Sequence, residues 1–243
     1  MIGLTESGDV YARRGYTPER SAVSQRRFRR FGMPLAAIPK ERMAGTSRAC
    51  RAIIAVRLAD PAREWEALRA LQALQFLSGD RLDDDAAIAR AVGEEAVAAI
   101  DSPAVLEAYE RDRAEARSAA GTPAEAQGKT ATTDGPVRFT APSVVFRDGE
   151  RELVAGGFQS LAAYDVLLAN LDPSLARRPA PEDVADAVAA FPGGLYTAEV
   201  AEIYATGPAY ETDHPATEDA LIGAAAAGRL RRDGQRWEAV PLP

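Results

Sequence analysis

The amino-acid sequence predicts a mixed α/β fold in two parts, a larger one over residues 1–175 and a smaller one over residues 181–243. Apolar residues recur at helical spacing through residues 47–117, which predicts a long helical block. Residues 137–155 are rich in β-branched and aromatic side chains around an Asp-Gly turn signal, which is typical of strands. Three prolines at 173, 179 and 181 then predict a stiff linker between the parts.

The first helix is predicted to start at Pro18 and to end at Gly32. Thr17 precedes it as the N-cap, and proline is well tolerated in a first turn because its missing N–H has no helical partner there. The helix carries the run Arg26-Arg27-Phe28-Arg29-Arg30-Phe31. Such a run usually buries its phenylalanines and exposes its arginines to water, although it has the composition of an anion- or RNA-binding segment.

The helical block is predicted to consist of five helices. They run from the Ser47 cap to about Leu58, from Asp60-Pro61 to about Leu77 with Trp65, Leu68, Leu71 and Leu74 on one apolar face, from Asp83–Asp85 through Ile88 and Val92, over 94–100, and from the Ser102 cap to Arg117. Residues 118–136 are small, polar and rich in Gly and Pro, so we expect a loop.

The strand region ends in a helix. The stretch Val137–Phe146 predicts a strand that Ala141-Pro142 interrupts, Asp148-Gly149 predicts a hairpin turn, and 152–155 predicts the returning strand. Gly156-Gly157 then ends that strand, since the pair is too short for a phosphate-binding loop. Ser160 is predicted to cap a helix that runs to Leu171.

The smaller part is predicted to contain helices over 182–190, 198–205 with Thr197 as its cap, and from Thr217 to about Ala227, followed by a hairpin around Asp233-Gly234. This order resembles that of a winged helix, a fold that often binds DNA. Residues 176–243 carry 11 carboxylates against 6 arginines, of which Arg229, Arg231, Arg232 and Arg236 cluster on the hairpin. Because DNA binding needs clustered cations, a protein-interaction or domain-capping role is the better interpretation, and nucleic acid is an unfavoured partner.

Composition excludes several kinds of chemistry. Cys50 is the single cysteine and His214 the single histidine, so an internal disulfide, a cysteine metal cluster and a His-pair metal site are all excluded within this sequence. No apolar run approaches the roughly 20 residues needed to span a bilayer. The first residues lack the order of a secretory signal, so we expect a cytoplasmic protein.

The sequence resembles the DsbA-like branch of the thioredoxin-fold proteins, which includes dithiol–disulfide isomerase-like and 2-hydroxychromene-2-carboxylate isomerase-like members. The resemblance covers about residues 1–172. It rests on the element order at 137–171, with Thr140-Ala141-Pro142-Ser143 matching the cis-proline segment, and on helix residues that include Ser47–Ala52, Trp65, Gln75, Tyr109 and Asp112. It implies a thioredoxin-like fold with a large helical insertion over about 47–117 and a cis-proline β-β-α unit over 137–171.

The resemblance also implies a function. Members of the family carry out thiol–disulfide or glutathione-linked chemistry, so glutathione is left open as a cosubstrate and no other cofactor is implied. Thr140, Ala141 and Pro142 would bind a peptide or a small thiol substrate. A second interpretation is a non-catalytic adaptor that uses the same groove, and a third is a nucleic-acid regulator that uses the smaller part.

The sequence departs from the family where the family places its reactive thiols. The family pattern begins with a strand and a Cys-x-x-Cys helix, and neither is found here; Met1–Leu4 looks like the strand that follows that helix. We therefore expect a start codon further upstream, and an in-frame stop codon just before Met1 would contradict this. The 243 residues are expected to be inactive in dithiol exchange, with no catalytic residue, because one cysteine cannot form an internal disulfide.

The remaining reactive side chains favour structural roles. Cys50 lies about one turn inside its predicted helix on the side of Ile53 and Ile54, which indicates a core thiol and not a nucleophile. His214 falls in a polar stretch that predicts an exposed loop. Asp83-Asp84-Asp85 directly precedes a predicted helix, where carboxylates cap the first turn and favour the helix dipole, so capping is expected and not a cation site.

Overall fold

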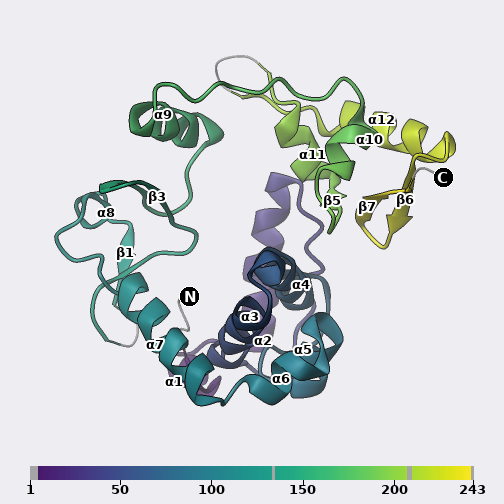
Figure 1. Ribbon diagram of the computed structural model, residues 1–243. Coiled ribbons are helices and arrows are strands. Elements are labelled where there is room, and N and C mark those ends of the chain that lie inside the picture. Colours follow the sequence, from purple (N-terminus) through teal and green to yellow (C-terminus); the bar gives the residue numbers. More distant parts are fainter. Residues whose placement is uncertain (1–4, 133–134, 207–209, 242–243) are drawn as a thin grey trace. The chain divides into compact units, whose positions relative to one another are not determined.

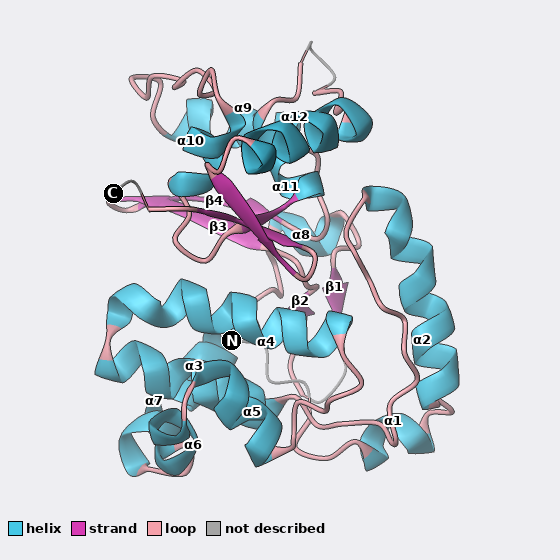
Figure 2. Cartoon of the chain, turned by 90° about the vertical axis from the view of Figure 1, so that its right-hand side faces the viewer, coloured by secondary structure: helices cyan, strands magenta, loops and turns pink. Residues whose placement is uncertain are grey.

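The computed structural model describes residues 5–132, 135–206 and 210–241. In these residues the protein is a mixed α/β structure that is mostly helical, with twelve α-helices and small antiparallel sheets (Figures 1 and 2). The chain divides into two compact units: unit 1 holds the described residues up to Gln25 and Ala36–Asp172, and unit 2 holds Arg26–Leu35 and the described residues from Pro173 onward. The predicted strand end at Met1–Leu4 lies outside the described residues.

The predicted helices of unit 1 occur in the predicted order. The helices of this unit are α1 (Asp9–Arg13), α2 (Pro18–Arg26, whose last residue belongs to unit 2), α3 (Ser47–Ala59), the 3-10 turn η2 (Pro61–Arg63), α4 (Glu64–Leu77), α5 (Asp85–Val92), α6 (Glu94–Ala99), α7 (Pro103–Ala116), α8 (Pro123–Ala126) and α9 (Leu161–Leu171). Of these, α1 and α8 are two further helices in segments that were expected to be loops.

Helix α3 is the centre of the helical core, with α4, α5, α6 and α7 packed around it (Figure 1). Its residues Ala52 and Ile54 have no exposed surface, and neither have Ile88 of α5 and Ile100 after α6. Small alanines alternate with branched side chains along α3, so neighbouring helices approach closely on several sides. This packing holds α7, which leads into the strand region.

Two details of the helical core differ from the predictions. Ser47 is the first residue of α3 and is buried, so it does not cap the helix; the backbone N–H groups of Thr46 and Ser47 both donate to the carbonyl oxygen of Thr5 instead. Trp65 is 62% exposed, whereas Leu71 on the same helix is buried. Trp65 lies in the first turn of α4, and the prediction that it belongs to the apolar face is wrong.

The region between α7 and the hairpin is more structured than predicted. Residues 118–136 contain α8 and the two-residue strand β1 (Thr130–Ala131), which pairs antiparallel with β2 (Arg138–Phe139). Strand β3 (Val144–Asp148) pairs antiparallel with β4 (Arg151–Ala155) in a separate sheet. The predicted single strand is therefore two strands of different sheets, because the chain bends between them.

Helix α9 is capped at both ends. Its N-cap is Ser160, as predicted, whose hydroxyl oxygen accepts from the backbone N–H of Ala163. At its other end, the Arg151 guanidinium donates to the carbonyl oxygens of Asn170 at 2.7 Å and Leu171 at 2.5 Å. These carbonyls have no helical partner, so a cation there satisfies them and the helix dipole together.

Unit 2 contains the 3-10 helix η1 (Arg27–Phe31), the helices α10 (Val184–Ala189), α11 (Thr197–Ile203) and α12 (His214–Ala226), and the strands β5 (Leu195–Tyr196), β6 (Leu230–Asp233) and β7 (Arg236–Ala239). The strands form one antiparallel sheet in the order β5-β7-β6. Trp237 of β7 and Leu221 of α12 are buried in a common core with Val188 and Val200.

Helix boundaries in unit 2 correct two capping predictions. Asp213, and not Thr217, caps α12: its carboxylate accepts from the backbone N–H of Ala216 at 2.9 Å. The helix therefore starts at His214, which does not lie in the predicted loop. Thr197 opens α11, but its hydroxyl oxygen accepts from the indole N–H of Trp237 at 3.0 Å and does not cap the helix.

Candidate functional site

The predicted substrate-binding residues Thr140, Ala141 and Pro142 form the bend between β2 and β3, and the Ala141–Pro142 peptide bond is cis. Thr140 is fixed by one acceptor. Its backbone N–H and its hydroxyl both donate to the carbonyl oxygen of Lys129, at 3.1 Å and 3.0 Å. Thr140 is thus tied to the chain just before β1 and positions the two residues that follow.

Ser143 closes the same bend. Its hydroxyl donates to the carbonyl oxygen of Thr140 at 2.5 Å and accepts from the backbone N–H of Gly157 at 2.9 Å. One side chain thereby joins the start of β3 to the end of β4. Sequence reasoning missed this role, because a serine after a proline is also common in an ordinary turn.

The backbone of Ala141 has no hydrogen-bond partner among the described residues, whereas the backbone of Thr140 has two. Neither the N–H nor the C=O of Ala141 hydrogen-bonds to any other described residue, and both Ala141 and Pro142 are exposed. In the described part of the chain, β3 pairs with β4 alone, so its other edge is unpaired as well. An exposed peptide group thus adjoins an open strand edge.

The glycine pair 156–157 lets the chain after β4 pass close to this bend. A Cβ at Gly156 would lie 2.9 Å from the Cβ of Ala124 and 3.1 Å from that of Lys129. Gly157 has a φ of +70°, which disfavours other residues. The pair is therefore a close-packed turn, as predicted.

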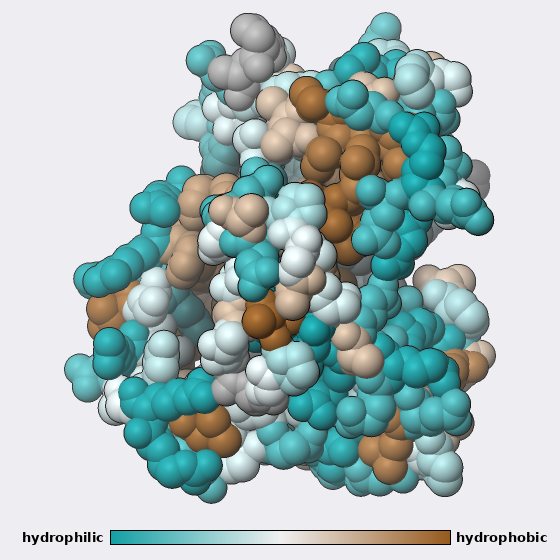
Figure 3. Space-filling view, turned by 90° about the vertical axis from the view of Figure 1, so that its left-hand side faces the viewer, coloured by the Kyte–Doolittle hydropathy of each residue, from teal (hydrophilic) through white to brown (hydrophobic). Residues whose placement is uncertain are grey.

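Apolar side chains remain exposed beside the hairpin. Phe146 packs edge-to-face on Tyr164 of α9, with ring centroids 6.2 Å apart, so α9 covers one face of the hairpin. The large apolar residues Phe158, Leu161, Val166 and Leu168 nevertheless stay exposed, and Figure 3 shows a continuous apolar area over α9 and the β3–β4 hairpin. Surface of this kind is typical of an interaction site.

Cys50 and His214 belong to helices and not to this bend. Cys50 is a half-buried residue of the first turn of α3 and packs against the helical core, in agreement with the prediction of a structural thiol. His214 belongs to unit 2, where its ring lies against Gly32: a Cβ on Gly32 would be 2.0 Å from the His214 Cε1 atom.

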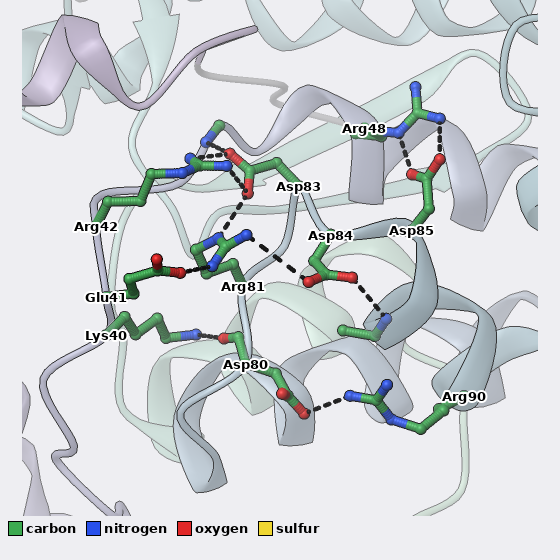
Figure 4. A network of polar contacts seen from close by, with 12 residues as sticks. Lys40, Glu41, Arg42, Arg48, Asp80, Arg81, Asp83, Asp84, Asp85 and Arg90 are labelled. Atoms are coloured by element: carbon green, nitrogen blue, oxygen red, sulfur yellow. Dashed lines mark hydrogen bonds and ion pairs between the residues drawn. The ribbon is translucent and has the colours of Figure 1, made fainter.

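The three carboxylates of residues 83–85 are paired, two with arginines and one with a backbone N–H of the helix that follows (Figure 4). Asp84 caps α5 by accepting a first-turn backbone N–H at 3.1 Å, as predicted. Arg42 binds both carboxylate oxygens of Asp83, at 2.7 Å and 3.1 Å, and Arg48 forms a similar pair with Asp85. The hydrogen bond from Arg48 lowers the pKa of Asp85.

Lys40 extends this network toward α4. Its Nζ donates to the side-chain oxygen of Gln75 at 2.9 Å and to the carbonyl oxygen of Asp80. Burial lowers the pKa of Lys40 to about 8, an effect that the charges of Asp80 and Asp83 partly offset. The network holds the segment before α3 against α4 and α5.

The arginines of the β6–β7 hairpin are paired with carboxylates. Arg229 binds Asp183 and Asp186, Arg231 binds Glu238, Arg232 lies 3.6 Å from Glu218, and Arg236 binds Asp233 and Glu238. Arg232 also stacks over the Trp237 ring at 4.8 Å. Their positive charge is therefore largely compensated within unit 2.

The sequence matches no protein-family model, and comparison with curated proteins finds no similar one. Over the part of the chain that the structure describes, no three His, Cys, Asp or Glu side chains gather into a group that could hold a metal ion. No helix in that part has the length and apolar character to cross a membrane.

Proposed function

We propose that residues 137–171 are the substrate-docking part of a thioredoxin-like, DsbA-like protein, and that an extended peptide or a small thiol binds at Thr140, Ala141 and Pro142. The observation that carries the proposal is the free backbone of Ala141 at the entry to a strand whose outer edge has no partner in the described residues. The order of strand, Ala-Pro bend, hairpin and helix supports it.

Docking would proceed by addition of a strand. The turn between Asp148 and Arg151 contains two residues, so these two flanking residues exchange hydrogen bonds across the hairpin. Because such pairs alternate along an antiparallel ladder, Val145 and Arg147 direct their backbone groups to the outer edge. An extended peptide that pairs with Ala141 continues along these groups, which is the usual mode of β-augmentation.

The bound peptide would also make apolar contacts. Helix α9 packs against the hairpin and leaves apolar side chains exposed, among them Leu161 and Val166. Main-chain pairing supplies affinity with little sequence preference, whereas apolar contacts select for hydrophobic segments. We therefore expect unfolded, apolar peptides to bind better than polar ones.

Thiol exchange would need a group that the docking residues do not contain. Cys50 is the single cysteine, and it packs against the helical core. An internal disulfide requires two thiols, so the 243 residues act in docking and are inactive in dithiol exchange by themselves. A thiolate from glutathione or from another polypeptide would have to attack the docked substrate.

Binding of fluorescein-labelled, reduced insulin B chain to the full chain tests the proposal. Val145→Pro removes one outward N–H and should weaken binding by about tenfold or more, while Val145→Thr keeps that N–H and should bind like the wild type. Circular dichroism must show that both variants are folded. Equal binding by Val145→Pro and the wild type would disprove edge docking.

A second proposal concerns unit 2. The order α10-β5-α11-α12-β6-β7 matches the order expected of a winged helix, so a DNA-binding regulator is the alternative function to consider. The paired hairpin arginines and the acidic residues Glu218 and Asp219 of α12 weigh against recognition of duplex DNA by these elements. We propose that this fold serves protein interaction or domain capping.

A further inference from the structure

The run Arg26–Phe31 forms a compact basic and aromatic surface in unit 2. Residues Arg27–Phe31 are a 3-10 helix, in which residues three apart lie on the same face. Phe28 and Phe31 therefore share one face, with ring centroids 6.3 Å apart and planes 27° from parallel. Arg27 and Arg30 share the next face, and the Arg30 guanidinium lies 4.9 Å from the centre of the Phe31 ring.

Both phenylalanines are open to solvent, contrary to the prediction that such a helix buries them. Phe28 is 52% exposed and Phe31 is 40% exposed. Exposed aromatic rings beside arginines are costly in water and are enriched at binding sites. The exposed phenylalanines therefore favour a binding role for the run over a structural one.

Two arginines of the run have no carboxylate partner among the described residues. Residues 21–39 contain no carboxylate, and Arg26 and Arg27 form no ion pair with any described residue. The hairpin arginines provide the contrast, since all four are paired with carboxylates. An anionic ligand could therefore bind the unpaired guanidinium groups of Arg26 and Arg27. On the hairpin it would have to compete with the carboxylates that already pair with the arginines.

Gly32 anchors the run to the core of unit 2. Its φ of +79° ends the 3-10 helix, and its backbone touches the ring of His214 at the start of α12. The Arg29 Nε–H donates to the carbonyl oxygen of Leu35 at 2.8 Å, and this hydrogen bond joins the 3-10 helix to the segment that follows Gly32. The run is thus presented by a folded unit, which reduces the entropy lost when a ligand binds.

We propose that Arg26–Phe31 binds single-stranded nucleic acid, with arginines on the phosphates and unpaired bases stacked on Phe28. Arginine suits phosphate geometry, and every unpaired base offers a face that can stack on an aromatic ring. Duplex DNA keeps its base faces covered and would engage the arginines alone. A membrane surface would require a longer amphipathic helix than this single short 3-10 helix.

Fluorescence anisotropy of labelled oligo(dT) and oligo(U), each of about 15 nucleotides, with the full chain tests the proposal. At about 50 mM salt, the double variant Arg27→Gln/Arg30→Gln should bind at least about tenfold more weakly, and its slope of log affinity against log salt should be smaller by about 1.4. Phe28→Ala should weaken binding by about fivefold or more and leave the salt slope unchanged.

The matched control is Arg231→Gln/Arg232→Gln, which changes the charge of unit 2 equally at paired arginines and should bind like the wild type. A preference for oligo(U) or for oligo(dT) supports the proposal and identifies the polymer. Equal weakening by the control, tighter binding to a duplex of the same length, or binding to phosphatidylserine vesicles without binding to either oligonucleotide would overturn it. Circular dichroism keeps a folding defect from being mistaken for loss of a contact.

Discussion

Replacement of Gly32 by alanine tests how the basic run is held on unit 2. Two separate penalties are expected. The φ of +79° places the residue in the left-handed region, where a Cβ costs about 1–2 kcal/mol. The new Cβ would also lie 2.0 Å from Cε1 and 2.3 Å from Nδ1 of His214, far inside van der Waals contact.

The two penalties can be separated by removing the imidazole. Relief of the overlap requires the ring or the run to move, which is a case of overpacking and costs about 1–3 kcal/mol. Gly32→Ala should therefore destabilise unit 2 by about 2–5 kcal/mol in the wild type, but by about 1–2 kcal/mol in a His214→Ala background. The difference is the coupling energy of a double-mutant cycle.

Urea denaturation followed by tryptophan fluorescence measures this coupling. Trp65 lies in unit 1 and Trp237 is buried in unit 2, so a Trp65→Phe background leaves Trp237 as the reporter of unit 2 alone. If the slope of the free energy of unfolding against urea concentration is the same in all variants, they undergo the same unfolding transition and their free energies can be compared. The same cost of Gly32→Ala with and without His214, or no cost at all, would refute the contact.

Two further predictions concern unit 1. Because burial lowers the pKa of Lys40 to about 8, its acylation by acetic anhydride should rise with pH to a plateau with a midpoint near 8. Denatured protein should give a midpoint near 10.4, so deprotonation of Lys40 makes folding more favourable as pH rises between those values; equal midpoints would contradict this. Ser143→Ala removes two hydrogen bonds at the docking bend and should lower the free energy of unfolding by about 1–3 kcal/mol in urea denaturation, whereas no loss would show that the bend does not depend on Ser143.

Local signals in the sequence were sufficient to predict helix caps and hairpin turns, whose hydrogen bonds join residues that are close in sequence. Ser102 and Ser160 precede helices that they cap, and Asp148-Gly149 gives the hairpin turn between β3 and β4. In each case the hydrogen bonds join residues only a few positions apart, so the sequence contains both partners of the interaction.

Interactions between distant residues were not predictable in this way. Strand β1 has two residues and no recognisable period, and it exists because Thr130 pairs with Phe139. Thr217 was predicted to cap α12, but Asp213 does so; the signal in the sequence that this prediction missed is Pro215, which suits a first helical turn. The contact between Gly32 and His214 joins residues 182 positions apart, and nothing in either segment predicts it.

The proposed docking residues follow from the resemblance, whereas the contacts that support them could not be predicted. Thr140, Ala141 and Pro142 were chosen together, yet the backbone of Thr140 is engaged by Lys129 and Ser143, while that of Ala141 has no partner in the described residues. This distinction depends on hydrogen bonds across 11 positions, from Thr140 to Lys129. It narrows the proposed docking group to Ala141 and the strand edge that follows.

Amide hydrogen exchange, read residue by residue by NMR, tests the docking proposal most directly. On addition of reduced insulin B chain, the amides of Ala141, Val145 and Arg147 should become protected, because their N–H groups would pair with the peptide. The amides of Val144 and Phe146 pair with β4 already and should change little. Protection confined to α9, or to unit 2, with no change at Ala141 would contradict docking at this edge.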